Sequence, residues 1–199
     1  MGRKPRFTDD DFLDAVLRVT ARTGAGAVTV AAVAAEAGAP VGSVYHRFAS
    51  RDLLLARLWV RTVRRFQQPF LTALADPDPD RGADRAVRAV FAWVREHPDE
   101  AAVLLLHRRE DLIARWPEEL GPESTTLNEA VASALRSYTR ARCGRVTPAA
   151  LERVAFALVD IPYAAIRTHL AAGRTPPASI EGIALTASRA VLGSGSSGG

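Results

Sequence analysis

Apolar residues recur at intervals of three and four along most of the chain, the spacing that places them on one face of an α-helix. Ala, Leu and Arg dominate the composition, and alternating runs of β-branched and polar residues, which favour strands, are nearly absent. We therefore expect an all-α fold.

The first predicted helix begins after Thr8 and ends near Gly24. Thr8 can cap its first turn, and Asp9–Asp11 place three carboxylates at the positive end of the helix dipole. The apolar stripe that should face inward contains Phe12, Val16 and Val19.

Three further helices are predicted before residue 75. Thr29 precedes a helix at Val30–Ala37, which stops at Gly38, and a short helix follows at Val41–Phe48. Ser50 caps a long helix at Arg51–Phe70.

Residues 76–80, Asp-Pro-Asp-Pro-Asp, are typical of a connector rather than a helix interior. Beyond them the pattern predicts helices at 82–96, 98–113, 122–142, 148–173 and 178–192. Pro162 lies inside one of them and predicts a kink, with Asp160 beside it either shaping a pocket or reaching solvent. Residues 193–199 have the Gly/Ser composition of a flexible tail outside the fold.

The strongest functional signal is the spacing of Ala34, Gly38 and Val44. Two helices that cross closely need a small residue at the contact, a glycine that tolerates positive φ in the turn, and a branched apolar residue that plugs the core. This combination, between two capped helices, predicts a helix-turn-helix.

The second helix of this motif should present a polar face outward. Val44 and Phe48 are expected to point to the core. The hydroxyl of Tyr45 suits a phosphate, and Arg47 can bind a guanine or a phosphate. The residues left on the outward face are Val41, Gly42, Ser43, Tyr45, His46 and Arg47.

The net charge of +4 is concentrated in the first third of the chain. Residues 1–66 hold 11 Lys and Arg against 6 Asp and Glu, which favours an anionic partner there. Arg3, Lys4 and Arg6 form a short basic arm. The arm either reaches DNA or is a solubilising tail, and both interpretations stay open.

Residues Val30 through Leu55, VAAVAAEAGAPVGSVYHRFASRDLLL, closely resemble the signature of the TetR (tetracycline-repressor-like) family. The resemblance implies a homodimer with a three-helix DNA-binding domain at about 1–50 and a larger helical domain for effector binding and dimerisation at 51–192. By position it assigns DNA contacts to the outward face just described, to Arg51 and to Thr29. One departure is Arg47, where many members have His.

The resemblance also implies an effector pocket in the second domain. The candidate lining residues are Trp93, His97, His107, Trp116, Phe156 and Asp160. The two tryptophans are equally typical of core positions. No His-x3-His pair exists and Cys143 is the single cysteine, so we expect no metal site and no cofactor.

The function that combines these features is a cytoplasmic repressor that binds a palindromic DNA operator and is released by a small apolar or amphipathic effector. A ligand-dependent activator is the first alternative, and a helical small-molecule-binding protein is the second. An enzyme is disfavoured, because no nucleophile–base constellation, phosphate-binding loop or metal set is visible. No apolar run is long enough to predict a membrane span.

Overall fold

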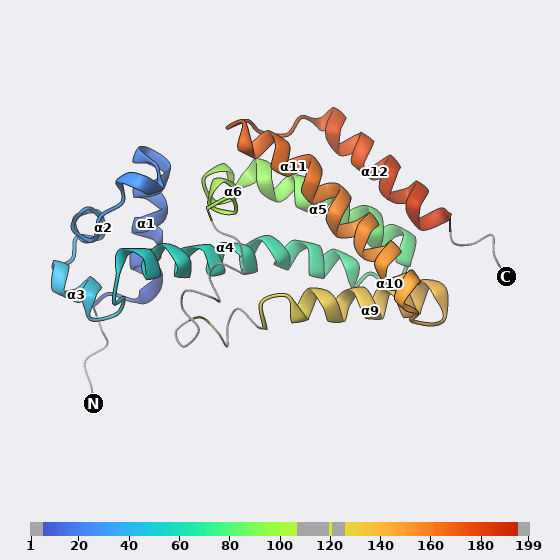
Figure 1. Cartoon of the computed structure of the whole chain (residues 1–199), viewed down its shortest axis with the longest axis horizontal. Helices are drawn as coiled ribbons and strands as arrows, with labels where there is room; N and C mark the ends of the chain where they lie inside the picture. The colour runs from blue at the N-terminus through green and yellow to red at the C-terminus, as the bar shows by residue number, and fades with distance from the viewer. Residues whose placement is uncertain (1–5, 107–119, 121–125, 195–199) are drawn as a thin grey trace. The chain divides into compact units, whose positions relative to one another are not determined.

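The computed structural model describes residues 6–106, 120 and 126–194, and these residues are helical with no strand among them (Figure 1). The all-α prediction is confirmed. The chain divides into two compact units, the first ending at Thr62 and the second beginning at Val63, and some residues beyond 105 join the first. Each unit is described by itself.

The first unit contains α1 (Asp9–Thr23), a short 3-10 turn (Ala25–Ala27), α2 (Val30–Ala37) and α3 (Val41–Tyr45). The helix α4 (Arg51–Leu74) begins in this unit and continues into the second.

The predicted start of α1 is confirmed by a reciprocal pair of capping bonds. The amide of Asp11 donates to the Thr8 hydroxyl at 3.2 Å, and the Thr8 amide donates to the Asp11 carboxylate at 2.7 Å. Two amides that have no partner within the helix are thereby satisfied. Hydrogen bonds from the Thr8 amide and then from the Thr8 hydroxyl to the Asp11 carboxylate hold the pKa of Asp11 below its usual range.

The core of the first unit is built by side chains that the pattern placed inward. Phe12, Val16, Val33 and Val44 are completely buried. Phe48 is also buried, and its ring meets the ring of Phe12 edge-on at a centroid distance of 6.4 Å. The end of the recognition segment is therefore fixed against the first helix.

The second unit contains the remainder of α4 and a set of helices that share one core. They are α5 (Pro79–Glu96), α6 (Pro98–Val103), α9 (Glu129–Cys143), α10 (Pro148–Ala155), a π-helical segment (Phe156–Asp160), α11 (Ile161–Ala171) and α12 (Ala178–Gly193).

Three helix ends differ from the prediction. α3 ends at Tyr45 because the amide of Arg47 bonds the carbonyl of Val44, which tightens the chain out of the α geometry. α4 continues to Leu74 in spite of Pro69. α5 begins at Pro79 rather than at residue 82, because the side chain of Asp78 caps it and a proline suits a first turn.

Two predicted helices are described only in part. α6 ends at Val103, before the expected end at 113, and residues 107–119 lie outside the described residues. α9 begins at Glu129, whereas the prediction began at 122, and residues 121–125 also lie outside them.

The proline inside the helix predicted at 148–173 is accommodated by a widened turn rather than a simple bend. The π segment Phe156–Asp160 directly precedes Pro162, and the amide of Ile161 bonds the carbonyl of Phe156, five residues earlier. The proline ring would otherwise clash with the carbonyl four residues before it, and the wider turn relieves that contact.

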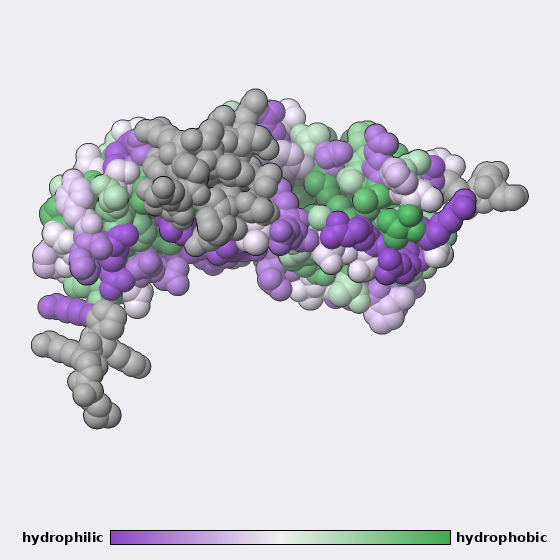
Figure 2. All heavy atoms as spheres, turned by 60° about the horizontal axis from the view of Figure 1, so that its bottom comes forward, coloured by the Kyte–Doolittle hydropathy of each residue, from purple (hydrophilic) through white to green (hydrophobic). Residues whose placement is uncertain are grey.

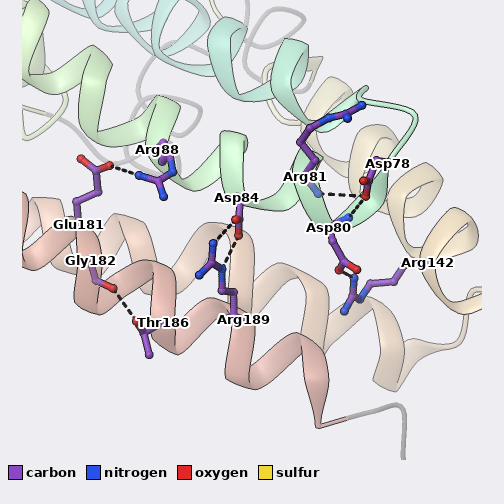
Figure 3. A network of polar contacts seen from close by, with 10 residues as sticks. All are labelled: Asp78, Asp80, Arg81, Asp84, Arg88, Arg142, Glu181, Gly182, Thr186 and Arg189. Atoms are coloured by element: carbon purple, nitrogen blue, oxygen red, sulfur yellow. Dashed lines mark hydrogen bonds and ion pairs between the residues drawn. The ribbon is translucent and has the colours of Figure 1, made fainter.

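Ion pairs join α12 to α5 on the surface of the second unit (Figure 3). Asp84 accepts from the guanidinium of Arg189, with one bond of 2.8 Å. Glu181 accepts from Arg95 at 2.5 Å and from Arg88 at 3.5 Å. The pairs supplement the apolar contacts that hold the last helix in place.

None of the described helices is long and apolar enough to cross a membrane. Hydrophilic side chains are spread over the face of the molecule drawn in Figure 2, with smaller apolar areas between them.

The connector between α4 and α5 is organised by the buried carboxylate of Asp76. It accepts bonds from Arg81 at 2.6 and 2.9 Å, from Arg85 at 2.9 Å, and from the amide of Asp78 at 3.0 Å. Hydrogen bonds from Arg81, and then from the Asp78 amide, hold the pKa of Asp76 far below its ordinary value.

The depressed pKa of Asp76 makes the stability depend on pH in one direction. Its stabilising contribution is present above the pKa of an unfolded aspartate, about 3.9, and is lost as the pH falls below that value. We predict that Asp76→Asn lowers the melting temperature at pH 7 and that the difference from wild type narrows below about pH 4.

The check is thermal unfolding followed by circular dichroism between pH 7 and pH 3. Asp99→Asn, which removes an exposed carboxylate from α6, is the control for charge alone. A constant difference between Asp76→Asn and wild type over this range would contradict the assigned role.

Candidate nucleic-acid interface and ligand cluster

The turn between α2 and α3 has the geometry that the sequence spacing predicts. Gly38 has φ of 64°, in the left-handed region that residues with a Cβ rarely adopt. Ala34 is buried, and its carbonyl accepts from the amide of Ala39 at 2.9 Å. Val44, one turn into α3, is completely buried. The three motif residues therefore fix the crossing of the two helices.

A forked ion pair braces α2 against α1. Arg18 and Arg22 each donate to one oxygen of Glu36, both at 2.7 Å. Hydrogen bonds from Arg22 and then Arg18 lower the pKa of Glu36. Both arginines are more than half exposed, so the pair orients α2 more than it stabilises the fold.

The outward face predicted for the recognition helix is assembled on α3 and the turn that follows it. Val41 and Tyr45 are exposed to 42% and 56%. Gly42 and His46 are exposed, and Ser43 is half-buried. Exposed apolar and aromatic groups on so short a helix have no role in the core, so this face is available to a partner.

A shallow groove of about 570 Å³ runs beside this face. The residues that line it come from the N-terminal arm and from α3 with its flanking turns: Arg6, Phe7, Pro40, Gly42, Ser43, His46 and Arg47. The guanidinium of Arg6 lies 5.5 Å from the centre of the Phe7 ring. Arg6 is thus next to the recognition helix, whereas Arg3 and Lys4 lie outside the described residues.

Arg47 and Arg51 were predicted to contact DNA, and the structure gives both guanidinium groups partners within the protein. Arg47 donates to the Asp9 carboxylate at 2.5 Å and to the Phe7 carbonyl at 2.7 Å. Arg51 donates to three backbone carbonyls of residues 25–28 and to Asp52. Sequence reasoning missed these bonds, because a cationic residue in a pattern does not identify its acceptor.

Thr29 is exposed and caps α2. Its hydroxyl oxygen accepts from the amide of Ala32 at 3.1 Å, which leaves the hydroxyl proton free to be donated outward.

Two of the predicted effector-binding residues meet in the second unit. The buried ring of Trp93 packs against Phe66 at a centroid distance of 5.2 Å and against His97 at 5.2 Å. His97 lies between the end of α5 and the start of α6. An aromatic cluster is thereby formed by residues of α4 and α5 and by His97.

A buried carboxylate adjoins this aromatic cluster, and sequence reasoning did not select it. Glu100 is 4% exposed, and one of its oxygens accepts from Arg65 at 2.6 Å. The other oxygen has no hydrogen-bond partner among the described residues, and His97 Nδ1 lies 3.9 Å from it. The spacing of three between His97 and Glu100 was the available signal, because it places both on one helical face.

The remaining effector candidates are distributed differently. Phe156 is 51% exposed and Asp160 is exposed, so neither lines an enclosed pocket in the described structure. His107 and Trp116 lie outside the described residues. Among residues 6–106 and 126–194, no group of three or more His, Cys, Asp or Glu is arranged to hold a metal ion.

A short recognition helix after a left-handed glycine turn, held by a three-helix core and followed by a second helical unit, defines a helix-turn-helix DNA-binding protein. Residues 12–58 match the model of the "Bacterial regulatory proteins, tetR family". This match covers the helix-turn-helix, and solved structures described as TetR-type regulators share the fold of this chain along nearly its whole length.

Three solved structures illustrate the likeness of the fold. A TetR transcription regulator from Haloarcula marismortui has a TM-score of 0.72 and 19% identity, covering 94% of this chain and 96% of its own. A TetR-like transcriptional regulator from Rhodococcus has a TM-score of 0.64 and 21% identity, covering 96% and 99%. The fatty acid degradation regulator FadR from Bacillus halodurans has a TM-score of 0.64 and 14% identity, covering 96% and 97%. No curated protein matches the chain in sequence.

Proposed function

We propose that this chain is a TetR-family regulator: a cytoplasmic homodimeric repressor, and not an enzyme, that binds a palindromic operator and is released by a small-molecule effector. The observation that carries the proposal is the exposed face of α3, which follows the Gly38 turn and presents Tyr45 and His46 away from the core. Two such helices, one from each subunit, would address successive major grooves about 34–36 Å apart.

The residues of this face divide by the contact that each can make. Gly42 and Ser43 are small and lie near the start of α3, so they allow a close approach to base edges. The hydroxyl of Tyr45 suits a phosphate, and His46 can donate to a base. Val41 offers an apolar contact for a thymine methyl. Thr29 and Arg6 flank this face and suit the phosphate backbone.

Substitutions on this face should separate affinity from sequence preference. Tyr45→Phe removes one phosphate donor, so we predict weaker binding to every duplex by about fivefold, close to 1 kcal/mol. His46→Ala and Ser43→Ala should instead change which base is preferred at individual positions. The measurement is selection from a random duplex pool, followed by titration of the enriched sequence.

The same selection tests the whole proposal. Enrichment of an inverted repeat with half-sites about one helical turn apart is the expected result. The proposed operator binding would be refuted if duplex retention were weak, strongly salt-dependent and without a sequence motif, both with and without candidate effectors.

Dimerisation is proposed through the C-terminal helices. Among the described residues five large apolar side chains are exposed, and three of them lie outside α3: Phe156 at 51%, Tyr163 at 40% and Ile183 at 64%. They lie in the π segment, α11 and α12, and α12 contacts both of the others. Pairing this surface with its symmetry mate would bury apolar area that a monomer leaves in water.

We predict that Phe156→Glu and Ile183→Glu weaken the dimer at least tenfold. Burying an apolar side chain of this size is worth about 1.5–3 kcal/mol, and the introduced carboxylate would have to be desolvated. Sedimentation velocity over a dilution series measures the effect. Ser133→Glu on α9 is the control, and equal sedimentation of all three variants would exclude this surface.

The effector is proposed to bind at the cluster formed by Phe66, Trp93, His97 and Glu100. The aromatic rings suit an apolar body, and the unpartnered oxygen of Glu100 can accept one hydrogen bond from it. The competing interpretation, that Trp93 is only a core residue, predicts no loss of ligand affinity when Glu100 is changed.

Compounds that release the enriched duplex from the protein identify effectors. We predict that Glu100→Gln weakens their binding about fivefold or more, because a charged acceptor is replaced by a neutral one. Titration of the free protein by calorimetry measures this, with Asp99→Asn as the control. Compounds that increase duplex retention instead would favour the alternative of a ligand-dependent activator.

A further inference from the structure

We infer that Arg51 is a positioning residue, which sets the start of α2 through the backbone of the preceding turn, and is not a phosphate contact. This inference rests on the proposed function, since what it positions is the DNA-binding motif. It revises the role that the sequence resemblance implies for Arg51.

Each of the three guanidinium nitrogens of Arg51 donates a hydrogen bond to an acceptor within the protein. Nε donates to the Val28 carbonyl at 2.6 Å. Nη2 donates to the Ala25 carbonyl at 2.5 Å and lies 3.3 Å from the Gly26 carbonyl. Nη1 donates to the Asp52 carboxylate at 2.8 Å, which holds the planar group in register with these acceptors.

Few side chains anchor the segment that Arg51 holds. Residues 25–27 form a single 3-10 turn that follows Gly24, and no side chain caps this turn. Ala25 is half-buried, and Gly26 and Ala27 are exposed, so only Val28 anchors the turn in the core. The charged guanidinium of Arg51 therefore supplies much of the order of this turn, because it donates to three backbone carbonyls between residues 25 and 28.

The position of this turn decides where α2 begins. Val28 is followed directly by Thr29, the residue that caps α2. Because Gly38 joins α2 to α3 through a tight turn, a shift at the start of α2 is passed to the recognition helix. Arg51 thus connects the beginning of α4 to the placement of α3.

Arg47 makes an equivalent connection at the other end of the motif. It follows α3 and bonds both the Asp9 carboxylate at the start of α1 and the carbonyl of Phe7. The recognition helix is therefore held on one side through Arg51 and α2, and on the other side through Arg47. The chemistry is the same, since each guanidinium bonds at least one backbone carbonyl.

A phosphate contact through Nε or Nη2 of Arg51 would require these bonds to be exchanged. To turn outward the guanidinium would release the carbonyls of residues 25–28, leaving the turn without its charged donor. The positioning role and a phosphate contact through these two nitrogens therefore exclude each other. The two roles also predict different results for a lysine. An ammonium retains the charge but cannot span the planar fork of acceptors.

The test compares Arg51→Lys and Arg51→Gln on the duplex enriched by the wild-type protein. Titrations at several salt concentrations give both the dissociation constant and the slope of log K against log salt, which changes by about 0.9 for each phosphate contact. Arg174→Gln, at an exposed position in the second unit, is the control for loss of one positive charge.

If Arg51 positions the motif, both variants bind about tenfold more weakly with the wild-type salt slope, because a smaller fraction of the protein is competent to bind. If Arg51 contacts a phosphate, the lysine variant keeps nearly full affinity, and the glutamine variant loses about 0.9 from the slope. That second result would overturn the inference.

A measurement on the protein alone keeps the inference separate from the proposed function. The amides of Ala27 and Val28 are bonded to the carbonyls of Gly24 and Ala25. In Arg51→Lys their hydrogen exchange should accelerate at least tenfold relative to amides in the middle of α1. Unchanged exchange at both amides would refute the positioning role even if no duplex is ever enriched, and faster exchange would support it in that case too.

Discussion

The left-handed turn at Gly38 is the constraint on which the DNA-binding unit depends. The turn brings α3 across α2 closely enough that only a small side chain fits at Ala34. α3 has five residues, far fewer than a helix needs to be stable by itself in water. Tertiary contacts therefore determine its shape and orientation. The main ones are the burial of Val44 and Phe48 and the hydrogen bonds of Arg47.

Local features of the sequence predicted the parts of the fold that local physics decides. The capping box at Thr8, the span of α2, the glycine turn and the outward face of α3 are readable because each depends on residues a few positions apart. The end of α3 and the start of α5 were misjudged by several residues. There a tightened turn and a capping aspartate outweighed the apolar pattern.

The partners of charged side chains could not be predicted in the same way. The excess of positive charge before residue 67 indicated an anionic partner. It could not reveal that Arg47 bonds acceptors 38 and 40 positions away, or that Arg51 bonds acceptors up to 26 positions away. Glu100 escaped notice for a related reason, because its burial follows from how α4 and α6 pack. The sequence therefore predicted which residues belong to the candidate site, but it predicted only part of how those residues are arranged and bonded.

The π segment before Pro162 has a consequence for the length of the chain. A π turn takes one residue more than an α turn over the same advance, so it behaves as a one-residue insertion retained within a continuous helix. Side chains after the segment are rotated relative to those before it. A deletion of one residue there would restore ordinary α winding and bring the Pro162 ring against the carbonyl four residues before it. The number of residues in this helix is therefore far less free to vary than the number of residues in a surface loop.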